Sequence, residues 1–125
     1  MAERNFDFME TLGRKRRVIS GSFVPNGASA IDNTQNTGSG FTVAYTSTGL
    51  YTITFRDKYA RRLFADASLE QATRSQDVEV NAVDAPNGSM TINGFARGGT
   101  TLADITAAAG TRINFVVIFD DSLQL

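Results

Sequence analysis

Large apolar residues alternate with small and polar ones between positions 41 and 55, on both sides of a turn that contains Gly49. An alternation of period two, rich in aromatic and β-branched residues and interrupted by such a turn, predicts a β-hairpin. One face is expected to be core, and its members are Phe41, Val43, Tyr45, Tyr51, Ile53 and Phe55. The opposite face carries Thr42, Thr46, Thr52 and Thr54, and it suits either water or a flat contact with another protein.

The same alternation predicts further strands over residues 17–23, 63–72, 76–83, 89–95 and 112–119. In the first of these, Ile19 and Phe23 share one face and Val18 lies on the other. The last stretch is apolar on both faces, because Val116 and Ile118 alternate with four other large apolar residues. Apolar residues on both faces predict a central strand.

The segments between these strands differ in character. Residues 56–62 are charged and are expected to form a connection with one helical turn, whereas residues 102–109 (LADITAAA) predict a short helix. Pro-Asn-Gly occurs at 25–27 and again at 86–88, and both copies predict turns, because proline fixes φ and glycine accepts a positive φ. Residues 28–40 predict a long loop, a kind of segment that is often functional.

These elements predict an all-β fold. Short strands with regularly spaced turn signals are typical of an antiparallel β-sandwich or a small barrel, jelly-roll-like, here with an extended N-terminal arm. A chain of 125 residues is of single-domain size. We expect the arm over residues 1–17 and the β-sandwich domain over residues 18–125.

Composition narrows the chemistry that this domain can perform. The chain contains no cysteine and no histidine, which excludes thiol nucleophiles, Ser-His-Asp triads and Cys/His zinc sites. We therefore expect a binding or structural module that is not an enzyme and has no cofactor, metal or small-molecule substrate. Asp77 and Glu79 share a strand face. We expect them to be ordinary solvated surface residues, and the alternative is that they bind a divalent ion or act as an acid–base pair.

Charge is unevenly distributed along the chain. Residues 1–62 hold nine basic and five acidic residues, a balance of +4, and residues 63–125 hold three and eight, a balance of −5. The densest cluster is Arg14, Lys15, Arg16 and Arg17. It is interpreted either as a solvated lead-in to the first strand or as a contact with an acidic partner. The acidic whole argues against nucleic acid, and no apolar stretch approaches the roughly 20 residues that span a bilayer.

Apolar residues also occur ahead of the basic cluster. Phe6, Phe8, Met9 and Leu12 have no clear period, and they require burial either on this domain or on a neighbouring molecule. Together with Arg14 to Arg17 they are the predicted partner-binding residues, with apolar anchors for burial and cations for an acidic surface.

Three stretches carry a resemblance to a known group of proteins. They are LGRKRRVISGSFVPNGASA (12–30), GFTVAYTSTGLYT (40–52) and GTRINF (110–115). The chain resembles small virion structural proteins of tailed bacteriophages, of the marine and cyanophage type. The resemblance implies a capsid decoration (cement) protein on the outer surface of the icosahedral shell, and it carries no catalytic motif.

That resemblance also implies partners and a location. The major capsid protein would be one partner and other copies of the chain a second, with a homotrimer favoured over a homodimer. Assembly would take place in the host cytoplasm, on the exterior of the capsid. The alternative is another virion part, such as a tail or fibre adhesin or a head-tail connector component, and an adhesin would bind through the loop at residues 28–40.

Overall fold

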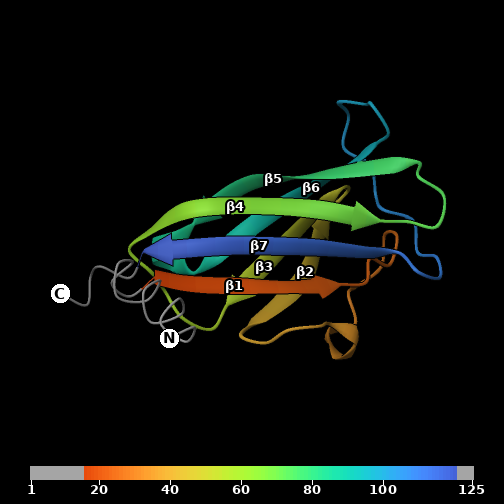
Figure 1. Ribbon diagram of the computed structural model, residues 1–125. Coiled ribbons are helices and arrows are strands. Elements are labelled where there is room, and N and C mark those ends of the chain that lie inside the picture. Colours follow the sequence, from red (N-terminus) through yellow and green to blue (C-terminus); the bar gives the residue numbers. More distant parts are fainter. Residues whose placement is uncertain (1–15, 121–125) are drawn as a thin grey trace, which may run out of the picture.

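A computed structural model describes residues 16–120, which form seven strands and two short 3₁₀ helices (Figure 1). The strands are β1 (Arg16–Phe23), β2 (Phe41–Ser47), β3 (Leu50–Phe55), β4 (Arg61–Glu70), β5 (Gln76–Asp84), β6 (Ser89–Ala96) and β7 (Arg112–Asp120). The 3₁₀ helices are η1 (Asn33–Gln35) and η2 (Ala85–Asn87).

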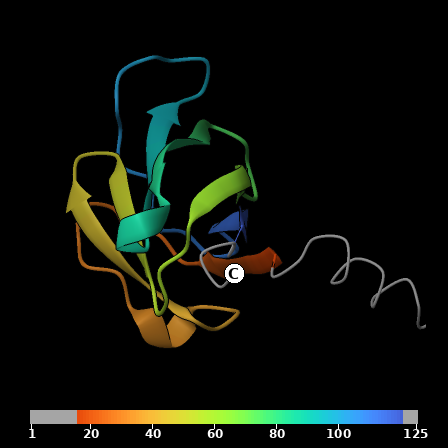
Figure 2. The ribbon, with the colours of Figure 1, turned by 90° about the vertical axis from the view of Figure 1, so that its left-hand side faces the viewer.

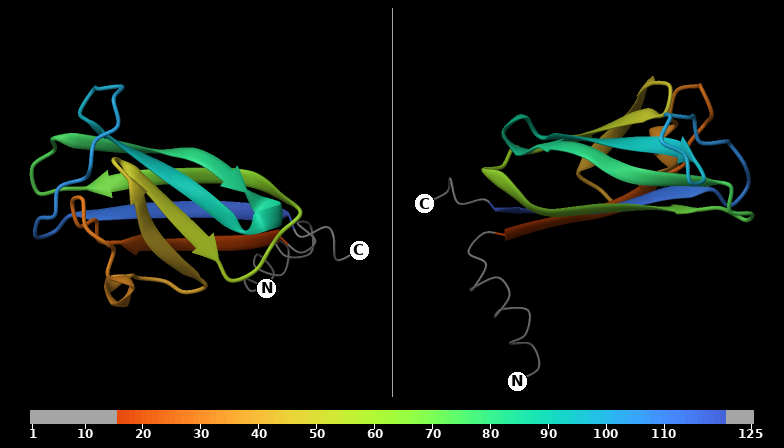
Figure 3. Two further views of the ribbon diagram at one scale, coloured as in Figure 1. Left: turned by 180° about the vertical axis from the view of Figure 1, so that it is seen from behind. Right: turned by 90° about the horizontal axis from the view of Figure 1, so that it is seen from above.

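The strands form two antiparallel sheets that pack face to face. One sheet has the order β1-β7-β4 and the other the order β2-β3-β6-β5. The two layers are separate when viewed along the strands (Figure 2) and from above (Figure 3, right). The predicted β-sandwich is therefore confirmed. Its jelly-roll character is not, because a jelly roll has eight strands in two Greek keys and the described residues form seven strands.

The predicted hairpin forms with its apolar face inward. Val43 lies opposite Ile53 and Tyr45 opposite Tyr51 in the register of β2 and β3. Val43, Tyr51 and Ile53 are buried in the core between the sheets, whereas Tyr45 packs at the margin of that core. The alternation therefore identified the inward face of this sheet correctly.

Strand β7 is central, as its two apolar faces predict, because it pairs with β1 on one side and β4 on the other. Its inward residues Ile113, Phe115, Val117 and Phe119 are all buried. Phe119 stacks on Tyr59, with ring centroids 4.3 Å apart, and meets Phe55 edge-on at 5.3 Å. These aromatic contacts join the two sheets at the end where β7 finishes.

The helix expected at residues 102–109 is not present, and this segment is irregular. Its alanines favour helix, but tertiary hydrogen bonds hold it against the hairpin in an irregular conformation. One Asp104 carboxylate oxygen accepts from the Tyr45 hydroxyl at 2.9 Å and from the Gly49 amide at 2.8 Å. The Tyr51 hydroxyl accepts from the amide of buried Ile105 at 3.0 Å.

The connection before β4 and the start of β1 also differ from those expected. Residues 56–60 contain bends but no helical turn, and Tyr59 in this connection is buried against Phe119. Strand β1 begins at Arg16, so Arg16 and Arg17 belong to the sandwich and not to an arm. The remaining residues of the expected arm lie outside the described residues.

The Tyr51 hydroxyl offers a direct test of the contact that holds residues 102–109. We expect Tyr51→Phe to lower the free energy of unfolding by about 1–3 kcal/mol, because it leaves the buried amide of Ile105 without an acceptor. Urea denaturation with an unchanged m-value would measure this loss. Tyr45→Phe is the control, because its hydroxyl bond is only partly buried. A loss no larger than that of the control would contradict the prediction.

Candidate interaction surface

The outward face of the three-stranded sheet carries a row of apolar side chains. Val18 of β1, Ile118 of β7 and Phe64 of β4 lie side by side in the register. Val18 is 52% exposed and Phe64 51% exposed, and Leu63 at the adjacent irregularity of β4 is 41% exposed. Figure 1 views this face from outside, and no described segment passes over it. We call Val18, Ile118 and Phe64 the apolar row.

Charged residues border the apolar row on the side where β1 begins. Arg16 and Arg61 both lie opposite Asp120 in the register, one on each side of β7. The Nη2 and Nε atoms of Arg61 lie 2.9 and 3.1 Å from Asp120 Oδ2. The Asp120 side chain is only 13% exposed, so this ion pair neutralises a carboxylate at the sheet surface, while the Arg61 side chain is 71% exposed.

Polar residues border the apolar row on its other side. Ser20, Val116 and Asp66 form the next row across the three strands. A shallow pocket of ≈220 Å³ lies beside Val116 and is lined in part by Asp66, Ser68 and Asn114. The outward face thus carries two arginines on one side of the apolar row and an aspartate on the other.

The predicted partner-binding residues fall partly on this face. Arg16 points to the outward side of β1, two residues before Val18, and Arg17 alternates to the other side. The other predicted residues lie outside the described residues, and they are Phe6, Phe8, Met9, Leu12, Arg14 and Lys15. Phe64 was not among the predicted residues, although a large apolar residue at an outward position of an alternating stretch was a usable signal.

The loop at residues 28–40 is held by its own hydrogen bonds. Asp32 caps η1 by accepting from the Thr34 amide at 3.0 Å and from the Thr34 hydroxyl at 2.6 Å. The Asn33 side chain bonds both backbone groups of Val43, and Arg112 bonds the Thr37 hydroxyl at 3.0 Å. Several polar side chains of the loop are therefore already used to fix its conformation.

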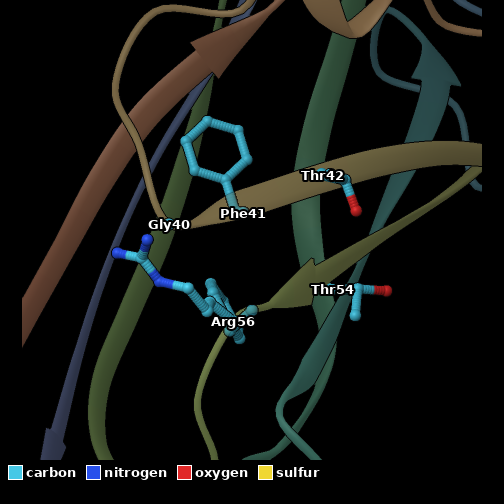
Figure 4. A pocket seen from close by; sticks show the side chains of 6 residues that line it. Gly40, Phe41, Thr42, Thr54 and Arg56 are labelled. Carbon is cyan, nitrogen blue, oxygen red and sulfur yellow. The ribbon is translucent and has the colours of Figure 1, made fainter.

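A second pocket lies where β2 begins and β3 ends (Figure 4). It has a volume of ≈380 Å³ and is lined by Phe41, Arg56, Thr42 and Thr54, among others. The Arg56 side chain extends toward Gly40, while the two threonine hydroxyls point away from the Phe41 ring (Figure 4). Phe41 packs edge-on against Phe115 at 4.9 Å. Its ring therefore closes the edge of the sandwich core, and the pocket offers one cation as its charged group.

The paired carboxylates of β5 have structural neighbours. Asp77 accepts from the Gly98 amide at 3.2 Å and forms an ion pair with Arg74 at 3.3 Å. The hydrogen bond from the Gly98 backbone amide is the main cause that holds the pKa of Asp77 below its ordinary value, and the hydrogen bond and charge of Arg74 add to it. Glu79 is exposed. Within residues 16–120, no group of three or more acidic side chains is placed to hold a metal ion.

No protein-family model, curated protein or solved structure matches the chain. Within the described part, no helix is long and apolar enough to cross a membrane.

The loop at residues 28–40 gives a pH-dependent prediction. Hydrogen bonds from Thr34 and then Gln35 hold the pKa of Asp32 below its ordinary value of 3.8. A carboxyl with a lowered folded pKa stabilises the fold at higher pH and loses that effect as pH falls through the folded value. We expect Asp32→Asn to lower the melting temperature at neutral pH, and the difference from the unmodified chain to shrink below pH 3.8. Thermal unfolding at a series of pH values measures this, and a constant difference would contradict it.

Proposed function

We propose that the chain is a non-enzymatic capsid decoration protein, which binds the outer surface of a phage shell and bridges neighbouring capsomers. The resemblance to virion structural proteins of tailed phages supports this proposal. The observation that carries it is the basic cluster, which leads directly into β1, a strand of the sheet whose outward face presents the apolar row, with Val18 and Phe64 each about half exposed. Contiguous exposed apolar residues with a polar rim are typical of protein-binding surfaces.

The basic cluster supports an acidic protein surface as the shell-side partner. Arg14 and Lys15 stand directly before β1 in the sequence, and Arg16 and Arg17 are exposed. Four consecutive cations favour association with an acidic surface by long-range attraction, which salt weakens. The apolar residues at positions 6–12 supply the contact area that such an attraction lacks. In this proposal, the major capsid protein is the partner and the virion exterior is the location.

Removing residues 1–12 tests the apolar anchors. We expect this deletion to weaken binding to phage heads that lack the chain by about thirtyfold or more, the effect of losing contacts worth about 2 kcal/mol. Co-sedimentation with purified heads measures the affinity. Circular dichroism should be unchanged in its β signal, because β1 begins at Arg16. Full binding by the truncated chain would overturn the role of the anchors.

Reversing charge in the basic cluster tests the electrostatic part. We expect Arg14→Glu with Lys15→Glu to weaken head binding, and to do so more at low salt than at high salt. The control is Arg74→Glu with Arg97→Glu, which makes the same change in net charge near the far ends of β4 and β6. A loss that is equal at all salt concentrations, or equal in the control, would contradict a specific role for the cluster.

A further inference from the structure

The outward face of the three-stranded sheet has the pattern of one half of a symmetric interface. We propose that this face binds the same face of a second copy of the chain, through a two-fold axis that lies between the sheets and crosses their strands. The proposal deepens the proposed function by naming how two copies join. It can be tested without shells, so its failure is distinct from a failure of shell binding.

The apolar row supplies the centre of this interface. With the axis along the row, Val18, Ile118 and Phe64 each face their own counterpart on the second copy. A self-complementary patch of this kind is the requirement of a two-fold interface. Single exposed apolar residues are ordinary on a protein surface. Three neighbours on three adjacent strands instead form a continuous strip that no described segment covers.

The charges on either side of the apolar row select this axis. Crossing the strands, the axis places Arg61 of one copy over Asp66 of the other, and Arg16 over Ser20. An axis along the strands would instead place Arg16 over Arg61, which brings two cations together. Among the described residues, Asp120 bonds Nε and Nη2 of Arg61, whose side chain remains 71% exposed, so its guanidinium has further N–H donors for a second carboxylate.

The pocket beside Val116 fits the same arrangement. Its volume is ≈220 Å³, and Asp66 and Ser68 line it on the acidic side of the apolar row. Under the proposed symmetry, the Arg61 side chain of the second copy lies over this pocket. A long side chain with an apolar stem and a cationic tip suits a hollow that ends at a carboxylate.

The size of the face indicates a weak dimer. Strand spacing near 4.8 Å and a rise near 3.4 Å per residue give this sheet a face of roughly 400 Å² per copy. Two such faces come to about 800 Å², below the 1,200–2,000 Å² or so that stable interfaces bury. We therefore expect a dimer that dissociates on dilution. The antiparallel arrangement also places the two β1 starts, and hence the two basic clusters, at opposite ends of the pair.

That arrangement has a consequence for the proposed function. A dimer with a shell-binding segment at each end can contact two neighbouring capsomers at once, and each contact raises the effective concentration of the other. This two-fold pair differs from the homotrimer that the phage resemblance favours, and the two are distinguished by mass.

Sedimentation equilibrium of the full chain, without shells, tests the pairing. We expect the mass to rise from 13.5 kDa toward twice that value with concentration. We expect Phe64→Ser to weaken association by about tenfold or more, the loss of a residue at the centre of an interface. Leu102→Ser is the matched control, because Leu102 is 38% exposed but lies on a different part of the molecule. A monomer at every concentration, or a trimer, would overturn the proposal.

Two further variants identify the face and its register. We expect Asp66→Lys to weaken association severalfold and Glu79→Lys, on the other sheet, to leave it unchanged. The chain has no cysteine, so Val18→Cys gives a single labelling site near the axis. Sheets packed about 10 Å apart are too distant for a disulfide, so a short bismaleimide is the linker. Efficient linking of Val18→Cys with none of Thr54→Cys supports the face, and the reverse result overturns it.

Discussion

The backbone pairing of β7 is the constraint on which the three-stranded sheet depends. β7 bonds to β1 along one edge and to β4 along the other, and these outer strands meet only through it. The register that this pairing sets has two effects. Inward, it aligns Ile113, Phe115, Val117 and Phe119 with the core of the other sheet. Outward, it aligns Ile118 with Val18 and Phe64, so the same hydrogen bonds that build the core also assemble the apolar row.

The outward positions of the two sheets are occupied by different types of residue. On the hairpin, threonines occupy the outward positions, and Thr46 and Thr52 hydrogen bond to each other at 2.6 Å. Threonine is β-branched and suits a strand while remaining polar. The three-stranded sheet places valine, isoleucine and phenylalanine at comparable positions. Strand propensity therefore does not account for the apolar row, since the other sheet fills its outward strand positions with threonine, which is polar and also favours strands.

Alternation was sufficient to predict the sandwich, the hairpin and the central place of β7, because inward and outward positions in a strand follow a period of two. It was insufficient wherever partners are distant in sequence. Residues 102–109 were predicted as helix, and they are irregular because Asp104 bonds Tyr45 and Gly49, 59 and 55 positions away. Identifying the apolar row also required the register of three strands. The basic cluster could be identified from the sequence, but its position next to the apolar row could not.

Apolar contact and charge make separate contributions at the outward face. The apolar row supplies affinity without direction, because hydrophobic association is not directional. The rows beside it supply direction, since only one arrangement of two such faces brings Arg61 over Asp66 and separates the cations. The same charges disfavour the other two-fold arrangement, because an axis along the strands would place Arg16 of one copy over Arg61 of the other. A face of this kind can remain exposed on a small acidic domain and still select one partner surface.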